Sequence, residues 1–153
     1  MIVREFVKED KEIFLELCEM FYGSSAVLRG FDRQMAEKTF SRILDRHENL
    51  WGYLFFDKEA NLPMGYALVT SYWCNEAGGE MIVLDEIFLN PISQHKGYAK
   101  LFMGWLEEQF SDAAAITLEV LAGNTHAREF YEKIGFTPDG FISYEKKTGK
   151  HIV

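Results

Sequence analysis

Cysteine is scarce in this chain of 153 residues, which contains only Cys18 and Cys74, and these two do not form a CxxC pair. Small secreted domains are held together by several disulfides, and two cysteines cannot build such a framework. We therefore expect both thiols to be reduced and partly buried, in a protein of the cytoplasm. The sequence places no base beside either cysteine, so we expect neither to be a nucleophile.

Long apolar runs are also missing. No stretch approaches the roughly 18 consecutive apolar residues that a membrane-spanning helix needs. The N-terminal stretch MIVREFVKEDKEIF lacks the apolar core of a signal peptide. We expect neither a membrane span nor a signal peptide.

Positive charge is in the minority. The chain has 16 lysines and arginines against 24 aspartates and glutamates, which gives a formal net charge of -8. This excess of acid argues against nucleic acids and anionic membranes as partners and suits a cationic small molecule. We expect no metal site, because metal-ligand spacing is absent among the four histidines, His47, His95, His126 and His151.

Apolar and aromatic residues, in contrast, are plentiful. Hydrophobic residues make up 48% of the chain, with 13 Phe, 7 Tyr and 3 Trp, which is enough to bury a core at this length. No linker, internal repeat or low-complexity segment divides the sequence. We therefore expect residues 1–153 to form a single domain.

Hydrophobic periodicity predicts the element order β-α-α-β-β-β-α-β-α-β. The predicted helices cover residues 8–22, 31–47, 95–110 and 124–135, and the predicted strands cover 2–6, 50–57, 64–73, 80–89, 114–121 and 141–147. Asp32 and Asn124 are expected N-caps, and Gly135 is an expected C-cap. Few of the connections are long enough to join parallel strands, so the order predicts a mixed sheet in an α/β (α+β) fold.

A lone glycine stands where the loop NPISQHKGYAK (residues 90–100) enters the third predicted helix. The first turn of a helix presents unpaired N–H groups and a partial positive charge, which together favour anions such as phosphates. Gly97 would let the chain approach a diphosphate closely, and the small side chain of Ala99 would leave room beside it. Gln94 could donate a hydrogen bond from its amide, and Lys96 adds a charge.

Three linked stretches of the sequence resemble the GNAT superfamily of acetyltransferases. The pattern Gln-x-x-Gly-x-Ala at residues 94–99 is similar to the family's phosphate-binding signature. LDEIFLNPISQ resembles the strand before it, and NTHAREFYEKIGF resembles a block near the family's C-terminus. The resemblance covers residues 50–146 well. It implies one acetyltransferase domain with a six- to seven-stranded, mostly antiparallel sheet, helices on both faces, and splayed fourth and fifth strands.

The resemblance implies acetyl-CoA as the acetyl donor. Its pyrophosphate would lie on the N–H groups of residues 95–100, and its pantetheine arm would pair with the backbone of Phe88 and Leu89 between the splayed strands. The N–H of Leu89 would polarise the thioester carbonyl. The implied contacts are Ile87, Phe88, Leu89, Gln94, His95, Lys96, Gly97, Tyr98, Ala99, Lys100, Asn124, Ala127 and Tyr131. His95-Lys96 departs from the Arg-Gly that is usual in the family, but the N–H groups remain.

Acetyl transfer to an amine needs the neutral amine. An amine with a pKa near 10.4 costs about 4.6 kcal/mol to deprotonate at pH 7, so a carboxylate, directly or through water, would accept the proton. Asp85 and Glu86 are the candidates, and strand alternation places them on opposite faces. The resemblance to spermidine/spermine acetyltransferases favours Asp85, while Glu86 remains open.

Tyr131 matches the position of the family's general acid. A tyrosine is a weaker acid than a thiol, so full proton transfer would be uphill by about 2 kcal/mol. We therefore expect Tyr131 to act mainly as a hydrogen-bond donor to the leaving thiolate.

The acceptor is less well defined by the sequence. The resemblance places substrate selection around FYGSSAVLRGF and SYWCNEAGGE, where the candidate contacts are Tyr22, Ser24, Ser25, Tyr72 and Glu76. A polyamine, an aminoglycoside-like amine, an amino acid and a protein N-terminus all remain open. The alternatives to an enzyme are a non-catalytic acyl-CoA sensor and an acidic interaction protein. The edge-like segment FISYEKKTGKHIV could pair across a two-fold axis in a homodimer.

Overall fold

A computed structural model describes residues 1–45 and 48–149. The helices are α1 (Lys11–Tyr22), α2 (Arg33–Leu44), α3 (Tyr98–Gln109) and α4 (Thr125–Lys133), with short 3-10 turns η1 (Lys8–Asp10) and η2 (Pro91–Ser93). The strands are β1 (Ile2–Glu5), β2 (Leu50–Phe56), β3 (Pro63–Cys74), β4 (Gly79–Leu89) and β5 (Ala115–Leu118). None of the helices in these residues is long and apolar enough to cross a membrane.

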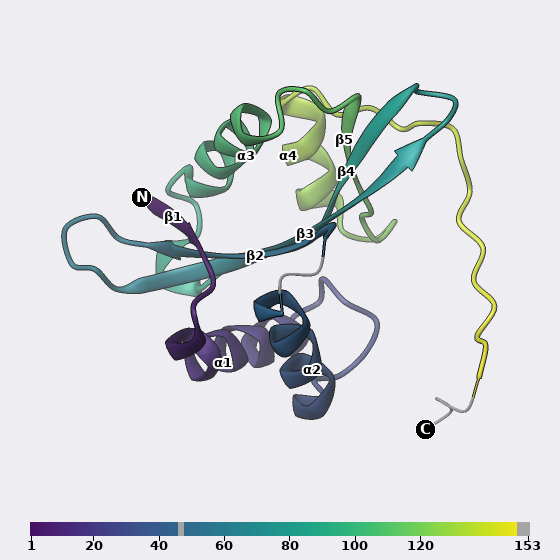
Figure 1. The fold of residues 1–153 in the computed structure, drawn as a ribbon. Coiled ribbons are helices and arrows are strands. Elements are labelled where there is room, and N and C mark those ends of the chain that lie inside the picture. Colours follow the sequence, from purple (N-terminus) through teal and green to yellow (C-terminus); the bar gives the residue numbers. More distant parts are fainter. Residues whose placement is uncertain (46–47, 150–153) are drawn as a thin grey trace.

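The sheet has the strand order β1-β2-β3-β4-β5. The first four strands are antiparallel neighbours, and β5 lies parallel to β4. Helices α1 and α2 cover one face of the sheet, while α3 and α4 lie on the other (Figure 1). The mixed, mostly antiparallel sheet with helices on both faces is confirmed.

The predicted number of strands was too high. The described residues contain a five-stranded sheet rather than six or seven strands, and residues 141–147 form no strand. The alternating pattern of FISYEKK suits a strand, but a strand also needs a neighbour with which to pair. After α4 the chain leaves the body as an extended, exposed segment (Figure 1).

The splaying of β4 and β5 is visible in their register. Their pairing runs from Met81↔Ala115 to Leu84↔Leu118 and stops there, although β4 continues to Leu89. The predicted strand 114–121 is therefore shorter than expected. An irregularity in β4 next to Leu84 accompanies the end of the pairing, as expected because bulges bend the strand that carries them.

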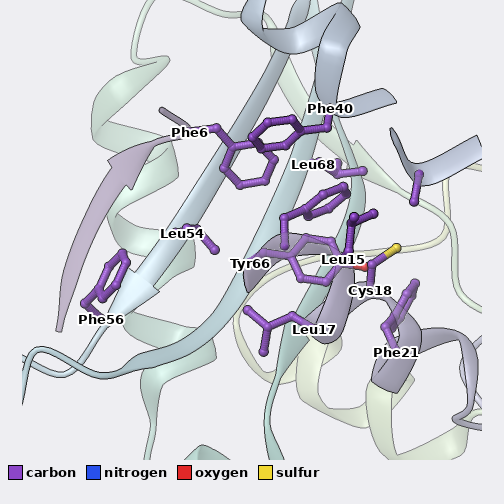
Figure 2. Close-up of a cluster of buried hydrophobic side chains, with 12 residues drawn as sticks. Phe6, Leu15, Leu17, Cys18, Phe21, Phe40, Leu54, Phe56, Tyr66 and Leu68 are labelled. Atoms are coloured by element: carbon purple, nitrogen blue, oxygen red, sulfur yellow. The ribbon is translucent and has the colours of Figure 1, made fainter. Parts of the chain in front are cut away.

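Two hydrophobic clusters hold the sheet between its helices. The cluster beneath α1 and α2 contains a group of close aromatic rings, including Phe6, Phe14 and Phe40, and reaches Tyr66 on β3 (Figure 2). The cluster on the opposite face is built around Phe102 and Leu106 of α3. These clusters make β2, β3 and the first part of β4 a rigid base for the loops that follow.

Candidate functional site

The end of β4 presents an open backbone edge. Asn90 donates its N–H to the carbonyl of Met64 at 2.8 Å, on the side of β3. Because backbone groups alternate between the two edges of a strand, Phe88 also directs its groups toward β3, whereas Ile87 and Leu89 direct theirs to the other side. On that side β5 has already diverged. The edge could therefore accept an extended ligand as an additional strand.

A β-bulge lies immediately before this edge. Leu68 pairs with Glu86 and Val69 pairs with Leu84, so Asp85 is the extra residue of β4. The bulge interrupts the alternation on which the expectation of opposite faces for Asp85 and Glu86 depended. Both carboxylates act on Tyr22, whose pKa is raised first by burial, then by the hydrogen bond to Glu86, with Asp85 contributing repulsion.

The Glu86 carboxylate is held by two tyrosines from different elements. Tyr22 at the end of α1 donates to Oε1 at 2.5 Å, and Tyr66 of β3 donates to Oε2 at 2.7 Å. Burial raises the pKa of Glu86, the two hydrogen bonds lower it, and the net direction is upward. Since Tyr66 is 0% exposed, this carboxylate has a defined position rather than a free one.

Asp85 has a different environment. It is more exposed than Glu86, and no hydrogen bond or ion pair within the described residues involves its carboxylate. Desolvation by the surrounding protein raises the pKa of Asp85, and the charge of Glu119 raises it further. A carboxylate that is free of partners and has a raised pKa can accept a proton from a bound amine.

The N-terminus of α3, which we call its mouth, has the features of an anion-binding site. His95 and Gly97 both adopt positive φ, at 60° and 81°, so the turn folds the backbone around Lys96. Gly97 is the N-cap of α3 and supplies no side-chain cap, which leaves the N–H groups of the first turn available. A side chain at Gly97 would find open space, with nothing within 4 Å. Such successive N–H groups at a helix start attract phosphates.

Gln94 ties this turn to the open edge. Its Nε2 donates to the carbonyl of Leu89 at 2.9 Å. This hydrogen bond connects the loop before α3 to the last residue of β4 and occupies the Leu89 carbonyl, so Leu89 offers its N–H at the open edge. Asn90 closes the intervening η2 turn by accepting from the N–H of Ser93 at 2.9 Å.

The start of α4 lies beside the mouth of α3. The ring centroids of His95 and His126 are 5.7 Å apart. Asn124 is the N-cap of α4, as predicted, and its Oδ1 accepts from the N–H of Ala127 at 3.2 Å. This bond uses the oxygen of the side chain, so Nδ2 can still donate to a ligand. Capping and ligand binding therefore need not compete for one atom.

Tyr131 lies on α4 between the rings of Phe130 and Phe136. It is half-buried and belongs to neither hydrophobic cluster. Burial raises the pKa of Tyr131, so the hydroxyl stays protonated at neutral pH. Within residues 1–45 and 48–149, no side-chain hydrogen bond involves this hydroxyl, which leaves it able to donate.

A cavity of about 500 Å³ opens between the α1–α2 loop and the β5–α4 loop. Its lining consists of Ser25, Leu28, Leu121, Ala122, Gly123, Asn124, Thr125 and His126. Among the predicted acceptor contacts, Ser25 lines the cavity, and Tyr22 reaches Glu86. Ser24 is occupied in capping α1, because its Oγ donates to the carbonyl of Phe21 at 2.6 Å.

The other two predicted acceptor contacts, Tyr72 and Glu76, lie toward the tip of the β3–β4 hairpin. Neither of them lines the cavity. The resemblance places substrate selection partly in this hairpin, and the role of the two residues as acceptor contacts stays a prediction.

The two cysteines are free thiols, and the described residues contain no cluster of potential metal ligands. Burial raises the pKa of the Cys18 thiol to about 11, so it is protonated at neutral pH, and Cys74 is also a free thiol. No group of three or more potential metal ligands occurs in the part of the chain that the structure describes. His47 and His151 lie outside the described residues.

Tyr66 is the functional candidate that the sequence alone does not reveal. Its hydroxyl reaches Glu86, yet in the sequence it is one aromatic residue in an apolar strand. The one available signal is the choice of tyrosine over phenylalanine at a core position, because a buried hydroxyl usually needs a partner.

Comparison with known proteins gives a consistent result. The family model described as "Acetyltransferase (GNAT) family" matches residues 11–136. A curated relative, the D-amino-acid N-acetyltransferase HPA3 of Saccharomyces cerevisiae, is 19% identical over 141 residues, which cover 91% of this chain and 86% of the relative.

Solved structures share the fold at low sequence identity. The aminoglycoside N-acetyltransferase AAC(6')-Iy, in complex with the bisubstrate analogue CoA-S-monomethyl-acetylneamine, aligns with a TM-score of 0.78 and 14% identity, covering 97% of this chain and 98% of that one. The ribosomal-protein-alanine N-acetyltransferase of Brucella melitensis biovar Abortus 2308 aligns with a TM-score of 0.75 and 17% identity, covering 96% and 98%. The acceptors named for these three proteins differ, so the shared fold does not define the acceptor.

Proposed function

Because the chain belongs to the acetyltransferase (GNAT) family, we propose that it transfers the acetyl group of acetyl-CoA to a primary amine of a small cationic acceptor. The amine attacks the thioester directly in a ternary complex. The observation that carries this proposal is the open edge at Ile87 and Leu89, which lies one short turn before the uncapped mouth of α3. These features suit the two ends of one extended ligand, the thioester and the diphosphate.

The co-substrate would be held mainly by backbone groups. The N–H groups of residues 95–100 suit the diphosphate, with Lys96 adding a charge. Alternation along β4 favours Ile87 and Leu89 over Phe88 for pairing with the pantetheine arm, since the backbone of Phe88 faces β3. The N–H of Leu89 would then polarise the thioester carbonyl, and Nδ2 of Asn124 could donate from the opposite wall.

Asp85 is our candidate for the proton acceptor. Glu86 already accepts hydrogen bonds on both oxygens, whereas Asp85 has a raised pKa and no hydrogen bond or ion pair in the described residues. In this proposal Asp85 takes the proton from the acceptor ammonium, directly or through water, and Glu86 attracts the ammonium into place. The roles could be exchanged, and separate substitution of the two residues distinguishes them.

Tyr131 would act on the other side of the reaction. When the C–S bond breaks, negative charge develops on the sulfur of coenzyme A. The protonated hydroxyl of Tyr131 can donate a hydrogen bond to that sulfur without giving up its proton, which matches its raised pKa.

The acceptor class follows from the charges around Asp85. The charge of Glu119 raises the pKa of Asp85, and the charges of Glu86 and Asp85 both raise the pKa of Tyr22. Such a grouping favours acceptors with several positive charges, such as polyamines or aminoglycosides, over amino acids, whose carboxylate would be repelled. We also propose a cytoplasmic location, since both cysteines are free thiols.

Two measurements test the proposed function. Calorimetric titration with acetyl-CoA should show binding, and its absence would remove the protein from coenzyme A chemistry altogether. Release of the coenzyme A thiol should then be followed over a panel of polyamines, aminoglycosides, D- and L-amino acids and peptides, with mass spectrometry of the products. We expect turnover with a polycationic amine. Binding without turnover across the whole panel would favour an acyl-CoA sensor instead.

A further inference from the structure

Tyr66 is a tyrosine at a core position where phenylalanine would fill the same space. Its side chain is 0% exposed, and its ring meets those of Phe14 and Phe21 edge-on, with centroids 5.2 and 6.2 Å apart. Figure 2 shows Tyr66 among the apolar side chains of the cluster beneath α1 and α2. A buried hydroxyl adds no apolar contact and needs a hydrogen-bond partner. The reason for tyrosine at this position therefore lies in the group that its hydroxyl meets.

That group is the Glu86 carboxylate. Tyr66 donates to Oε2 at 2.7 Å, and Tyr22 donates to Oε1 at 2.5 Å. In the part of the chain that the structure describes, no lysine, arginine or histidine pairs with Glu86. Neutral hydroxyls satisfy lone pairs of a carboxylate but do not cancel its charge, and an apolar pair of the same shape would cost the fold less. The arrangement therefore suits a ligand that brings positive charge.

The titratable neighbours of Glu86 come from three elements. Tyr22 and Cys18 lie on α1, Tyr66 lies on β3, and Asp85 precedes Glu86 on β4. Burial raises the pKa of the Cys18 thiol to about 11 and also raises the pKa of each tyrosine, so these three groups are neutral at pH 7. Burial and the charge of Asp85 raise the pKa of Glu86, whereas the two hydrogen bonds lower it. The hydroxyls of Tyr22 and Tyr66 thus favour the ionised carboxylate.

We propose that Tyr66 is a positioning residue for the acceptor: its buried hydroxyl holds the Glu86 carboxylate in the orientation that receives an ammonium group of a polyamine or aminoglycoside. Tyr66 acts through Glu86, because it is too deeply buried to touch the acceptor itself. Tyr22 is half-buried and ends α1, so its hydrogen bond to Glu86 also anchors the loop in which Ser25 and Leu28 line the cavity. The role of Tyr66 rests on the proposed function and adds to it a determinant of acceptor affinity.

The first test follows the Glu86 carboxylate by NMR in protein that carries isotope-labelled glutamate, with the signal assigned through Glu86→Gln. In Tyr66→Phe the midpoint of the Glu86 titration should move upward by about one pH unit, because a hydrogen bond that favours the ionised form is lost. Tyr22→Phe should move it in the same direction. An unmoved midpoint in Tyr66→Phe would overturn the proposal, whether or not the protein acetylates any amine.

Tyr53→Phe is the matched control. Tyr53 is 4% exposed and belongs to the cluster on the opposite face of the sheet. Within residues 1–45 and 48–149, no side-chain hydrogen bond involves its hydroxyl. Tyr53→Phe should therefore leave the midpoint of Glu86 unchanged. An equal move in Tyr53→Phe and Tyr66→Phe would contradict the proposal, because loss of any core hydroxyl would then be sufficient.

The second test uses spermidine and neamine as probes, each with and without coenzyme A. At least one of them should displace the Glu86 signal of the unsubstituted protein. At a pH below both midpoints, Tyr66→Phe should need about 10-fold more of the probe, the factor that corresponds to one pH unit. The difference should shrink as the pH rises above both midpoints, because Glu86 is then ionised in either protein. Failure of both probes to displace the signal would overturn the proposal.

Kinetics with an acetylated amine add a separate readout. Tyr66→Phe should raise KM for that amine by about 10-fold below both midpoints and change kcat by less than about 2-fold. A loss of kcat with an unchanged KM would contradict a role in acceptor binding. If the probes displace the signal but no amine is acetylated, the proposed catalytic activity fails while the effect of Tyr66 on cation binding stands.

Discussion

The two parts of this molecule are stabilised in different ways. In the described residues, every fully buried side chain lies between Phe6 and Leu106. The part from residue 111 to 149 contains β5, α4 and the extended residues 137–149, and no residue in it is fully buried. Yet this second part supplies Asn124, Tyr131 and most of the cavity lining. We refer to the two parts as the scaffold (residues 1–110) and the C-terminal region (residues 111–149).

The scaffold and the C-terminal region contribute differently to stability and to the proposed site. The scaffold builds its own core and fixes the open edge of β4 and the mouth of α3. Under the proposed function, the C-terminal region adds groups that face the ligand, and its surface is largely exposed. Stability should therefore depend mainly on the scaffold, whereas activity should depend on both parts.

Substitution in the scaffold core should have the largest effect. Phe102 is 0% exposed and packs against Phe55 and Trp105. Phe102→Ala should lower the free energy of unfolding by about 3–5 kcal/mol, because it leaves a cavity in a dense core. Phe130→Ala in α4 is the matched substitution and should cost about 1 kcal/mol or less. Urea unfolding measures both values, and similar losses would mean that the two parts do not differ.

Asp85→Asn should have the next largest effect, a loss of activity. Loss of a general base typically lowers the rate by roughly 10²–10⁴-fold. In the unsubstituted protein, activity should rise as the pH increases through the raised pKa of Asp85, and the variant should lose this limb of the profile. Glu86→Gln is the control, and we expect it to raise KM for the acceptor more than it lowers kcat. The reverse pattern would assign the base to Glu86.

Gly97→Ala should weaken the binding of acetyl-CoA by roughly 10-fold, because a residue with a side chain is strained by about 1–2 kcal/mol at positive φ. Gly104→Ala is a close control, since both glycines have open space for a Cβ but only Gly97 has a φ of 81°. Calorimetric titration of each variant compares them. If Gly104→Ala weakens binding as much as Gly97→Ala, the backbone of the turn is not the cause.

Tyr131→Phe should lower kcat by several-fold to about 10-fold, the cost of one lost hydrogen bond in the transition state. It should not change the affinity for acetyl-CoA or the Tm, because Tyr131 lies outside both hydrophobic clusters. Steady-state kinetics and thermal unfolding provide the two readings. An unchanged kcat would exclude this hydroxyl from the reaction.

The smallest effect concerns the stability contributed by Asp85. Its pKa is higher in the folded state, so its contribution to stability is complete below the unfolded pKa of about 3.9 and is lost as the pH rises through the folded pKa. At pH 7 the ionised group destabilises the fold, and Asp85→Asn should raise the Tm by at most a few °C. The gain should disappear near pH 3. The exposed Glu108→Gln should show no such difference.

Signals between residues close in sequence were sufficient to predict most of the helices and strands. The predicted caps at Asp32 and Asn124 are confirmed, since each accepts a hydrogen bond from the first turn of its helix, at 3.1 and 3.2 Å. The turn at Gly97 could be predicted as well, because it depends on residues adjacent in sequence.

Features that depend on distant partners could not be predicted in this way. The bulge at Asp85 arises from the register between β4 and β3, which alternation within β4 cannot reveal. The two hydrogen bonds to Glu86 connect α1, β3 and β4 through Tyr22 and Tyr66. The alternating pattern of residues 141–147 predicts a strand, because alternation is a property of the segment alone. It does not show whether a neighbouring strand is available for pairing.

The hydrogen bond from Gln94 to Leu89 has a consequence for selectivity under the proposed function. It links the loop before the proposed phosphate site at the start of α3 to the proposed thioester site at Leu89. The spacing between these two sites should therefore select donors whose arm has the matching length. A donor whose arm is too short, such as an acetylated cysteamine, could occupy one end only. A longer acyl chain would leave the thioester carbon at the same place beside Leu89, because the arm up to the sulfur is unchanged, and its extra methylene groups would extend beyond the thioester toward the acceptor.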